Sequence, residues 1–182
     1  MKTIKLFSVT LLISIFLTTC DATKIVNPNF NQKILFEAGY INFAWGKVHT
    51  GFLIDSVGNV FCYNLPQHWN NIDSLNQISE QAMDANLSQT NGVCLTVNLA
   101  ELKSKLPLLS NASRATTTKP KNEMNDAGVS YYLGYTFNNQ TKIYKQVLLK
   151  QTGDWAINNN SKAAEDLATW LFSISQQLNN LR

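Results

Sequence analysis

The sequence predicts a single α+β domain, built on an antiparallel sheet of about five strands with the helices packed on one face. Two observations predict it. Residues 34–64 and 129–150 contain segments with a period of two residues, and apolar residues three or four apart recur between and after them. The expected order is therefore βββ-αα-ββ-α. Strands in two such groups, instead of strands alternating singly with helices, are typical of α+β proteins.

The first group of strands is a predicted meander. Apolar residues alternate with others up to Trp45, and after a two-residue turn the alternation resumes over 48–55. Residues 56–59 include Gly and Asn, which tolerate the positive φ angles of tight turns. Residues 60–64 then form the third strand, so that consecutive strands pair as hairpins.

Two helices are predicted after Pro66. The first lies over 72–82, with Asn71 or Asp73 as its N-cap. Its apolar face, spaced three, three and four residues apart, consists of Ile72, Leu75, Ile78 and Ala82.

The second helix begins after Asn98, which with Glu101 makes a sequence close to a capping box. Leucines at helical spacing continue to Leu109, and Pro107 either kinks this helix or starts a new one. The polar residues 111–127 are expected to form a loop.

The second group of strands covers 129–137, the most regular alternation in the chain, and 142–150. A long final helix follows, capped by Asn160 or Ser161. Its apolar stripe consists of Ala164, Leu167, Leu171, Ile174, Leu178 and Leu181. This stripe predicts a helix packed on the sheet, because it is under three heptads long and so too short for a typical coiled coil.

The first residues have the features of a secretory signal peptide. Lys2 and Lys5 supply positive charge, and residues 6–17 are uncharged and largely apolar. A membrane span needs about 20 apolar residues, so this run is short for a permanent anchor. A buried N-terminal helix is the alternative interpretation.

Leu17-Thr18-Thr19-Cys20 resembles the lipobox of bacterial lipoproteins, although Thr19 is larger than the residue usual before the cysteine. The resemblance implies cleavage before Cys20, acylation of Cys20, and attachment to a membrane. The alternative is cleavage after Ala22, which would leave a secreted or soluble periplasmic protein. The expected organisation is a signal peptide over 1–19, an anchor and polar tether over 20–32, and one domain over 33–182.

Removal of the signal peptide and acylation of Cys20 change both the net charge and the number of free cysteines. The net charge of +3 falls to +1, because Lys2 and Lys5 lie in the signal. No basic patch remains to suggest a nucleic-acid partner. With Cys20 acylated, Cys62 and Cys94 are an even pair in an oxidising compartment, either bridged or present as two buried thiols. Neither their spacing nor that of the histidines suggests zinc, and no cofactor is expected.

No catalytic motif is present. The chain has no Gly-x-Ser-x-Gly, Ser-x-x-Lys, His-Glu-x-x-His or glycine-rich phosphate loop. His68 lies in a predicted loop and is a weak catalytic candidate. His49 is interpreted as a solvated position, and about 20 Å of strand separates it from Asp55. Glu37 and Asp154 flank apolar segments, but nothing in the sequence connects them.

Aromatic residues are the remaining candidates for a binding surface. Trp45, Tyr131 and Tyr135 are expected in the core, because they alternate with polar neighbours. Tyr132 falls on the opposite face of its strand, and Trp69 and Trp155 fall in loops. A binding surface is therefore predicted at Trp69, Tyr132 and Trp155.

The sequence is thus best interpreted as an exported, lipid-anchored bacterial envelope protein whose domain binds a protein or carbohydrate ligand. Two alternatives remain open. One is a small envelope hydrolase that uses His68, and the other is a purely structural envelope component.

Overall fold

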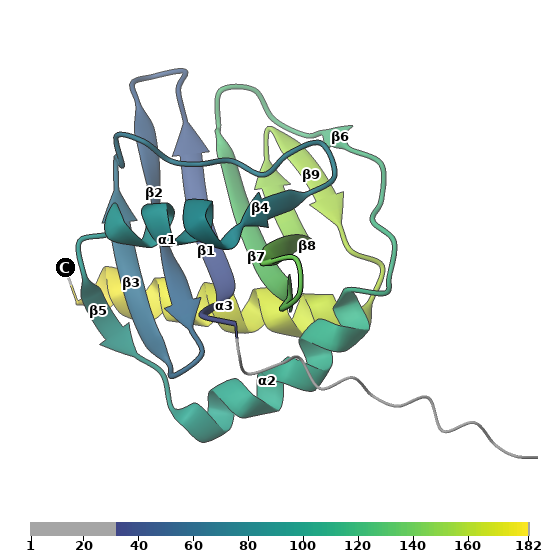
Figure 1. Ribbon diagram of the computed structural model, residues 1–182. Coiled ribbons are helices and arrows are strands. Elements are labelled where there is room, and N and C mark those ends of the chain that lie inside the picture. The colour runs from purple at the N-terminus through teal and green to yellow at the C-terminus, as the bar shows by residue number, and fades with distance from the viewer. Residues whose placement is uncertain (1–31, 182) are drawn as a thin grey trace, which may run out of the picture.

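The computed structural model describes residues 32–181, which form three helices and one large antiparallel sheet (Figure 1). The sheet strands are β1 (Ile34–Asn42), β2 (Val48–Asp55), β3 (Asn59–Asn64), β4 (Gln77–Ser79), β5 (Val93–Thr96), β6 (Lys121–Asn122), β7 (Val129–Asn138), β8 (Ile143–Gly153) and β9 (Trp155–Asn158). The helices are α1 (Glu80–Ser88), α2 (Leu99–Ala112) and α3 (Lys162–Asn180). The signal peptide, Cys20 and most of the tether lie outside the described residues.

The sheet has nine strands, not about five. Its order is β5-β3-β2-β1-β7-β8-β9-β6, and β4 pairs with the first part of β8. The five predicted strands are all present, and the additional ones are two to four residues long. Strands this short have no detectable period, and they form because a longer strand already offers an edge for pairing.

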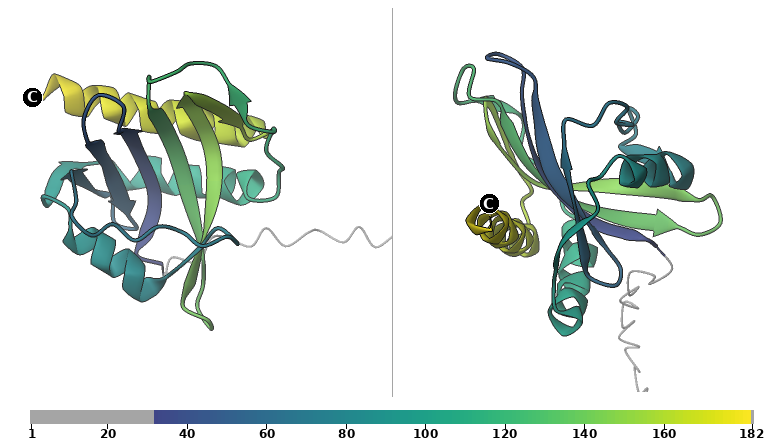
Figure 2. Two further views of the ribbon diagram at one scale, coloured as in Figure 1. Left: turned by 90° about the horizontal axis from the view of Figure 1, so that it is seen from above. Right: turned by 90° about the vertical axis from the view of Figure 1, so that its left-hand side faces the viewer.

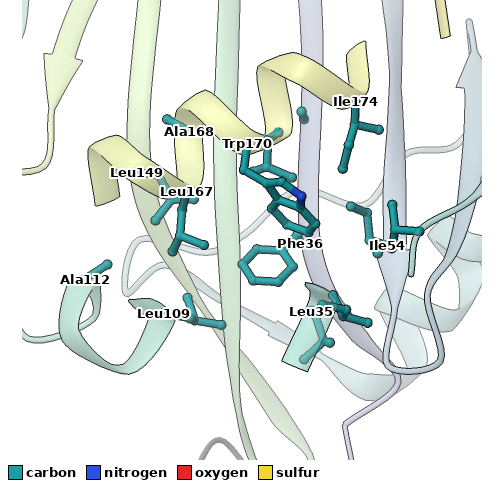
Figure 3. Packing of buried hydrophobic residues seen from close by; sticks show 14 of the residues in the cluster. Leu35, Phe36, Ile54, Leu109, Ala112, Leu149, Leu167, Ala168, Trp170 and Ile174 are labelled. Carbon is teal, nitrogen blue, oxygen red and sulfur yellow. The ribbon is translucent and has the colours of Figure 1, made fainter. Parts of the chain in front are cut away.

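The helices pack on both faces of the sheet, so the prediction that all of them lie on one face is wrong. The two longer helices, α2 and α3, cover one face, and α1 lies against the other (Figure 2). The α3 stripe is buried as predicted, and the Trp170 ring meets the Phe36 ring edge to face at 5.2 Å (Figure 3). Leu181, at the end of the stripe, is exposed.

Helix α1 begins eight residues later than predicted. Ser79 is its N-cap, and Ile78 belongs to β4 instead of to a helical face. The carboxylate of Asp73 accepts hydrogen bonds from the backbone N–H groups of Leu75 and Gln77, and Asn76 has a φ of 58°. These bonds fix a turn, which competes with the helix at this point.

The other helix starts follow the predicted caps. Asn98 caps α2 and Ser161 caps α3, each through its side-chain oxygen. Pro107 lies inside α2, which continues past it to Ala112. Glu101 accepts a hydrogen bond from the Trp170 indole N–H at 2.8 Å, which joins α2 to α3.

Strand β1 ends at Asn42, three residues before the predicted end at Trp45. Asn42 donates hydrogen bonds to the Tyr40 hydroxyl and to the Asp126 carbonyl oxygen, and it accepts one from the Ala44 N–H. Residues 43–47 therefore form a loop. Trp45 is 84% exposed at its tip, which corrects its predicted place in the core.

Candidate functional site

A buried carboxyl group with three tyrosine hydroxyls around it lies on the α1 face of the sheet. Glu37, on β1, is only 4% exposed. Its Oε2 accepts a hydrogen bond from Tyr135 at 2.5 Å, and its Oε1 accepts from Tyr63 at 3.0 Å and from Tyr131 at 3.2 Å. The Tyr63 and Tyr131 hydroxyl oxygens are 2.8 Å apart. The four side chains form one hydrogen-bond network.

Strand register brings these side chains together. Glu37 lies opposite Leu133 on β7, so Tyr131 and Tyr135 flank it on the same face, two residues away in each direction. Diagonal neighbours of this kind are about 7–8 Å apart at Cα, within reach of long side chains. The Glu37 carboxylate therefore accepts from both tyrosines of its neighbouring strand.

Two paired glycines make room for the tyrosine side chains. Gly39 on β1 lies opposite Gly51 on β2. A Cβ atom on Gly39 would be 2.5 Å from the Tyr131 hydroxyl and 2.6 Å from the Tyr63 hydroxyl, closer than real contacts allow. Tyr63, on β3, therefore reaches Glu37 on β1 across a strip of sheet that lacks side chains.

His49 extends the network on β2. Its Nε2 lies 3.4 Å from the Tyr131 hydroxyl, and its ring meets those of Tyr63 and Trp69 edge to face. His49 is 8% exposed, so the prediction of a solvated position is wrong. The alternation over 48–55 does not show that both faces of this sheet are covered.

A pocket of about 280 Å³ opens beside this network, and we call it the Glu37 pocket. On the sheet side its lining residues include Glu37, His49, Tyr131, Tyr135, Gln146 and Gln151. The opposite wall comes from the chain between β3 and β5 and consists of Trp69, Asn70, Asn71, Ile72, Ile78 and Asn86.

That opposite wall is held by hydrogen bonds and by a disulfide. The buried Asn86 side chain on α1 accepts from the Asn70 N–H at 2.7 Å and donates to the Asn70 carbonyl oxygen at 2.9 Å. Cys62 and Cys94 are bridged, with Cα atoms 5.8 Å apart, which confirms the disulfide alternative. The bridge closes the loop that contains all six residues of this wall.

Burial controls the protonation of the network. Removal from water raises the pKa of Glu37, although the three hydroxyl donors oppose this shift. Burial, with the nearby Glu37 charge, raises the pKa of Tyr63 and of Tyr135 well above the usual range. The pKa of His49 is lowered by burial and by the charge of Lys47, which favours the neutral imidazole.

A second pocket, of about 240 Å³, lies on the opposite face of the sheet. Tyr132 and Cys62 line it together with Phe172 and other residues from the end of α3. Tyr132 is half-buried there, and the lining contains no carboxylate, lysine, arginine or histidine.

Two of the three aromatic residues predicted as a binding surface, Trp69 and Tyr132, lie on opposite faces of the sheet. Trp69 is half-buried in the Glu37 pocket, with its ring centroid 4.4 Å from that of Tyr63. Tyr132 lies on the other face, and Trp155 is 47% exposed on β9. Trp69 and Tyr132 therefore do not belong to one surface.

The candidate catalytic groups make no hydrogen bond or ion pair with one another in the described part of the chain. His68 is exposed in the loop between β3 and β4, and no hydrogen bond or ion pair joins it to another described side chain. The Asp154 carboxylate accepts from the backbone N–H groups of Ala127 and Gly128 and so shapes the loop before β7. Within residues 32–181, no three His, Cys, Asp or Glu side chains gather as a metal site would require.

Sequence reasoning missed most of the site. From the sequence alone, Glu37 is an isolated carboxylate and Tyr131 and Tyr135 are core residues with no predicted function. Nothing in the sequence singles out Tyr63. The signal available was a charged residue within the apolar run 34–41, at an alternation position shared with Gly39 and Ile41. A charge on a buried face needs polar partners, and only the strand order reveals which tyrosines supply them.

Comparisons with protein-family models, with curated proteins and with solved structures give no match to this chain. In the part of the chain that the structure describes, no helix has the length and apolar character needed to cross a membrane. The assignment of function therefore depends on the geometry of the site.

Proposed function

We propose that this chain is an exported, lipid-anchored protein of the bacterial envelope, and that its domain is a binding module with the Glu37 pocket as its ligand site. The observation that carries the proposal is the pocket itself. It combines apolar and aromatic walls with a few polar groups, and at its side lies a buried carboxyl group whose pKa is perturbed. Concave sites of this composition are typical of ligand binding.

The construction of the site supports binding in a preformed pocket. The Glu37 network joins three strands, and the Asn86 side chain holds the opposite wall to α1. Groups that are already ordered lose little conformational entropy when a ligand binds. The polar groups of this pocket are therefore positioned before the ligand arrives.

Two features support the proposed location. The first 20 residues resemble a lipoprotein signal, and Cys62 and Cys94 form a disulfide. Disulfides persist in oxidising compartments and are rare in the cytosol. The intact mass of the exported protein tests this part. An acylated chain that begins at Cys20 is expected, whereas an unmodified chain that begins at Thr23 would contradict the lipid anchor.

A thermal-shift screen of the purified mature protein tests the binding function. The compounds should include amines, carboxylic acids, sugars, amino acids and short peptides. A ligand at 100 times its Kd stabilises the folded state by about 2.7 kcal/mol, which gives a measurable rise in Tm. At least one class of compound is expected to raise the Tm.

Two tryptophan variants provide the matched comparison. Trp69→Ala removes a wall of the pocket, and Trp155→Ala removes an exposed tryptophan on β9. The shift caused by a ligand should shrink in the first variant and persist in the second. The proposal fails if no class of compound raises the Tm, or if every ligand stabilises Trp69→Ala as much as the unmodified protein.

A further inference from the structure

The ionisable groups that line the Glu37 pocket give it a negative charge only. Glu37 is the only carboxylate among its lining residues, which include no lysine or arginine. His49 is the only lining residue that could become cationic, and its lowered pKa favours the neutral form. Lys47, whose positive charge helps to lower the pKa of His49, is exposed and does not line the pocket. Its charge is therefore screened by water and salt.

The carboxylate of Glu37 has no cationic partner among residues 32–181, the part of the chain that the structure describes. The ion pairs found within residues 32–181 join side chains that are at least about a third exposed, and none of them includes Glu37. Its two oxygens offer about four acceptor positions, and three tyrosine hydroxyls are within hydrogen-bond distance. Hydroxyl donors satisfy most of the hydrogen bonding of a buried carboxylate but do not neutralise its charge.

Aromatic rings form much of the remaining surface near this carboxylate. Trp69, Tyr131 and Tyr135 line the pocket from different elements. The faces of such rings attract cations, and tryptophan does so most strongly. An anionic ligand would find no cationic side chain in the lining and would be repelled by Glu37.

We infer that the Glu37 pocket takes a small organic cation, whose ammonium group becomes the counter-ion of Glu37 against the aromatic wall. The inference rests on the proposed binding function and narrows it to one ligand chemistry. At about 280 Å³ the pocket is at the small end of known ligand sites. It therefore suits a small amine or one amine-bearing end group.

Proton linkage agrees with this assignment. Burial raises the pKa of Glu37 in the free protein, because the charged form is poorly compensated. A cation beside the carboxyl group would favour the ionised form and so oppose this shift. The neutral Tyr63, Tyr131 and Tyr135 side chains keep their protons, since the pKa of each is raised well above its usual value.

The test compares matched probes that differ in charge, with the unmodified mature protein in a calorimeter at pH 8. One set is phenethylamine, 2-phenylethanol and 3-phenylpropanoate, and a smaller set is ethylamine, ethanol and propanoate. A hydrogen bond that involves a charged group is stronger than one between two neutral groups. The amine of at least one set should therefore bind at least about tenfold more tightly than its alcohol, and the carboxylates should bind least.

Glu37→Gln removes the charge and keeps the shape of the side chain. This variant should lose the preference for amine over alcohol while it keeps its affinity for the alcohol. Glu165→Gln is the matched control, because Glu165 is exposed on α3 and pairs with Lys162. The control should keep the full preference. If Glu37→Gln does not fold, the charge series with the unmodified protein decides the inference alone.

The possible failures are distinguishable. If alcohols or carboxylates bind as tightly as amines, or if Glu37→Gln keeps the preference, the cation assignment is overturned while the binding function stands. The same holds if the thermal-shift screen yields only neutral or acidic ligands and no amine of either set binds. If no compound of any class binds, both proposals fail.

Discussion

Tyr135 donates its hydroxyl hydrogen to Oε2 of Glu37 across 2.5 Å, although 98 residues separate them in the chain. Both side chains are at least 96% buried, and their strands β1 and β7 are neighbours at the centre of the sheet. This bond therefore connects the two halves of the chain inside the core. It also makes the ionisation of Glu37 depend on correct pairing of β1 with β7.

Tyr135→Phe should destabilise the protein, because it leaves one oxygen of a buried carboxyl group without its donor. A lost partner of this kind costs about 1–3 kcal/mol. The measurement is the free energy of unfolding in urea. Tyr132→Phe is the matched control, since Tyr132 is half-buried and its hydroxyl makes no hydrogen bond with a described residue. A loss no greater than that of the control would show that the Tyr135 bond contributes nothing.

Because the pKa of Glu37 is raised, its contribution to the free energy of unfolding should decrease as pH rises. Between the ordinary value of 4.5 and the raised value, the folded state holds a proton that the unfolded state has released. Stability from Glu37 is therefore present at low pH and falls as pH rises through this window. The difference in unfolding free energy between the unmodified protein and Glu37→Gln should decrease over the same range. A flat difference would contradict the shift.

The contribution of His49 to stability should change with pH in the opposite direction, so His49 serves as the control for that experiment. Its folded-state pKa is lowered from 6.5, so below 6.5 the unfolded state binds more protons than the folded state. Stability from His49 is present above 6.5 and is lost as pH falls through the lowered pKa. The unfolding free energy of the unmodified protein minus that of His49→Gln should therefore increase with pH. Equal slopes for the two variants would mean that neither group is responsible.

Gly39→Ala should disturb the site without straining the backbone of β1, where Gly39 has no positive φ. The new methyl group would meet the hydroxyls of Tyr63 and Tyr131 and push at least one of them from Glu37. Overpacking of this kind typically costs about 1–3 kcal/mol. The expected result is lower stability together with weaker ligand binding. Ser130→Ala, on the other face of β7, should leave both unchanged.

The sequence predicts the parts of this fold whose hydrophobic period is long enough to measure. The alternation over 129–137 and the stripe from Ala164 to Ile174 are confirmed as β7 and the buried face of α3. The predicted helix start at residue 72 is wrong, because apolar residues three and four apart do not reveal the Asp73 turn, after which the helix begins at Glu80. Short strands such as β4 depend on a partner edge, which local sequence does not encode.

The site was harder to predict than the fold for a related reason. Alternation shows which residues of a strand share a face, but not whether that face meets water or a second layer. His49 was therefore interpreted as solvated, whereas the loop carrying Trp69 covers it. Tyr63 reaches Glu37 only because two glycines on different strands pair opposite each other, and that register is a property of the assembled sheet.

The Cys62–Cys94 disulfide should support the ligand site as well as the fold. It closes a loop of about 33 residues, for which the chain-entropy model gives roughly 3.5–4 kcal/mol. The same loop carries Trp69 and Asn86 on the outer wall of the Glu37 pocket. Reduction should therefore both lower the free energy of unfolding and weaken ligand binding. Urea unfolding and calorimetry, each with and without a phosphine reductant, measure the two effects.

The double variant Cys62→Ala/Cys94→Ala should behave as the reduced protein does and should not respond to the reductant. A reduced protein that loses stability but keeps its full affinity would mean that the Asn86 hydrogen bonds to Asn70, and not the disulfide, hold the wall in place.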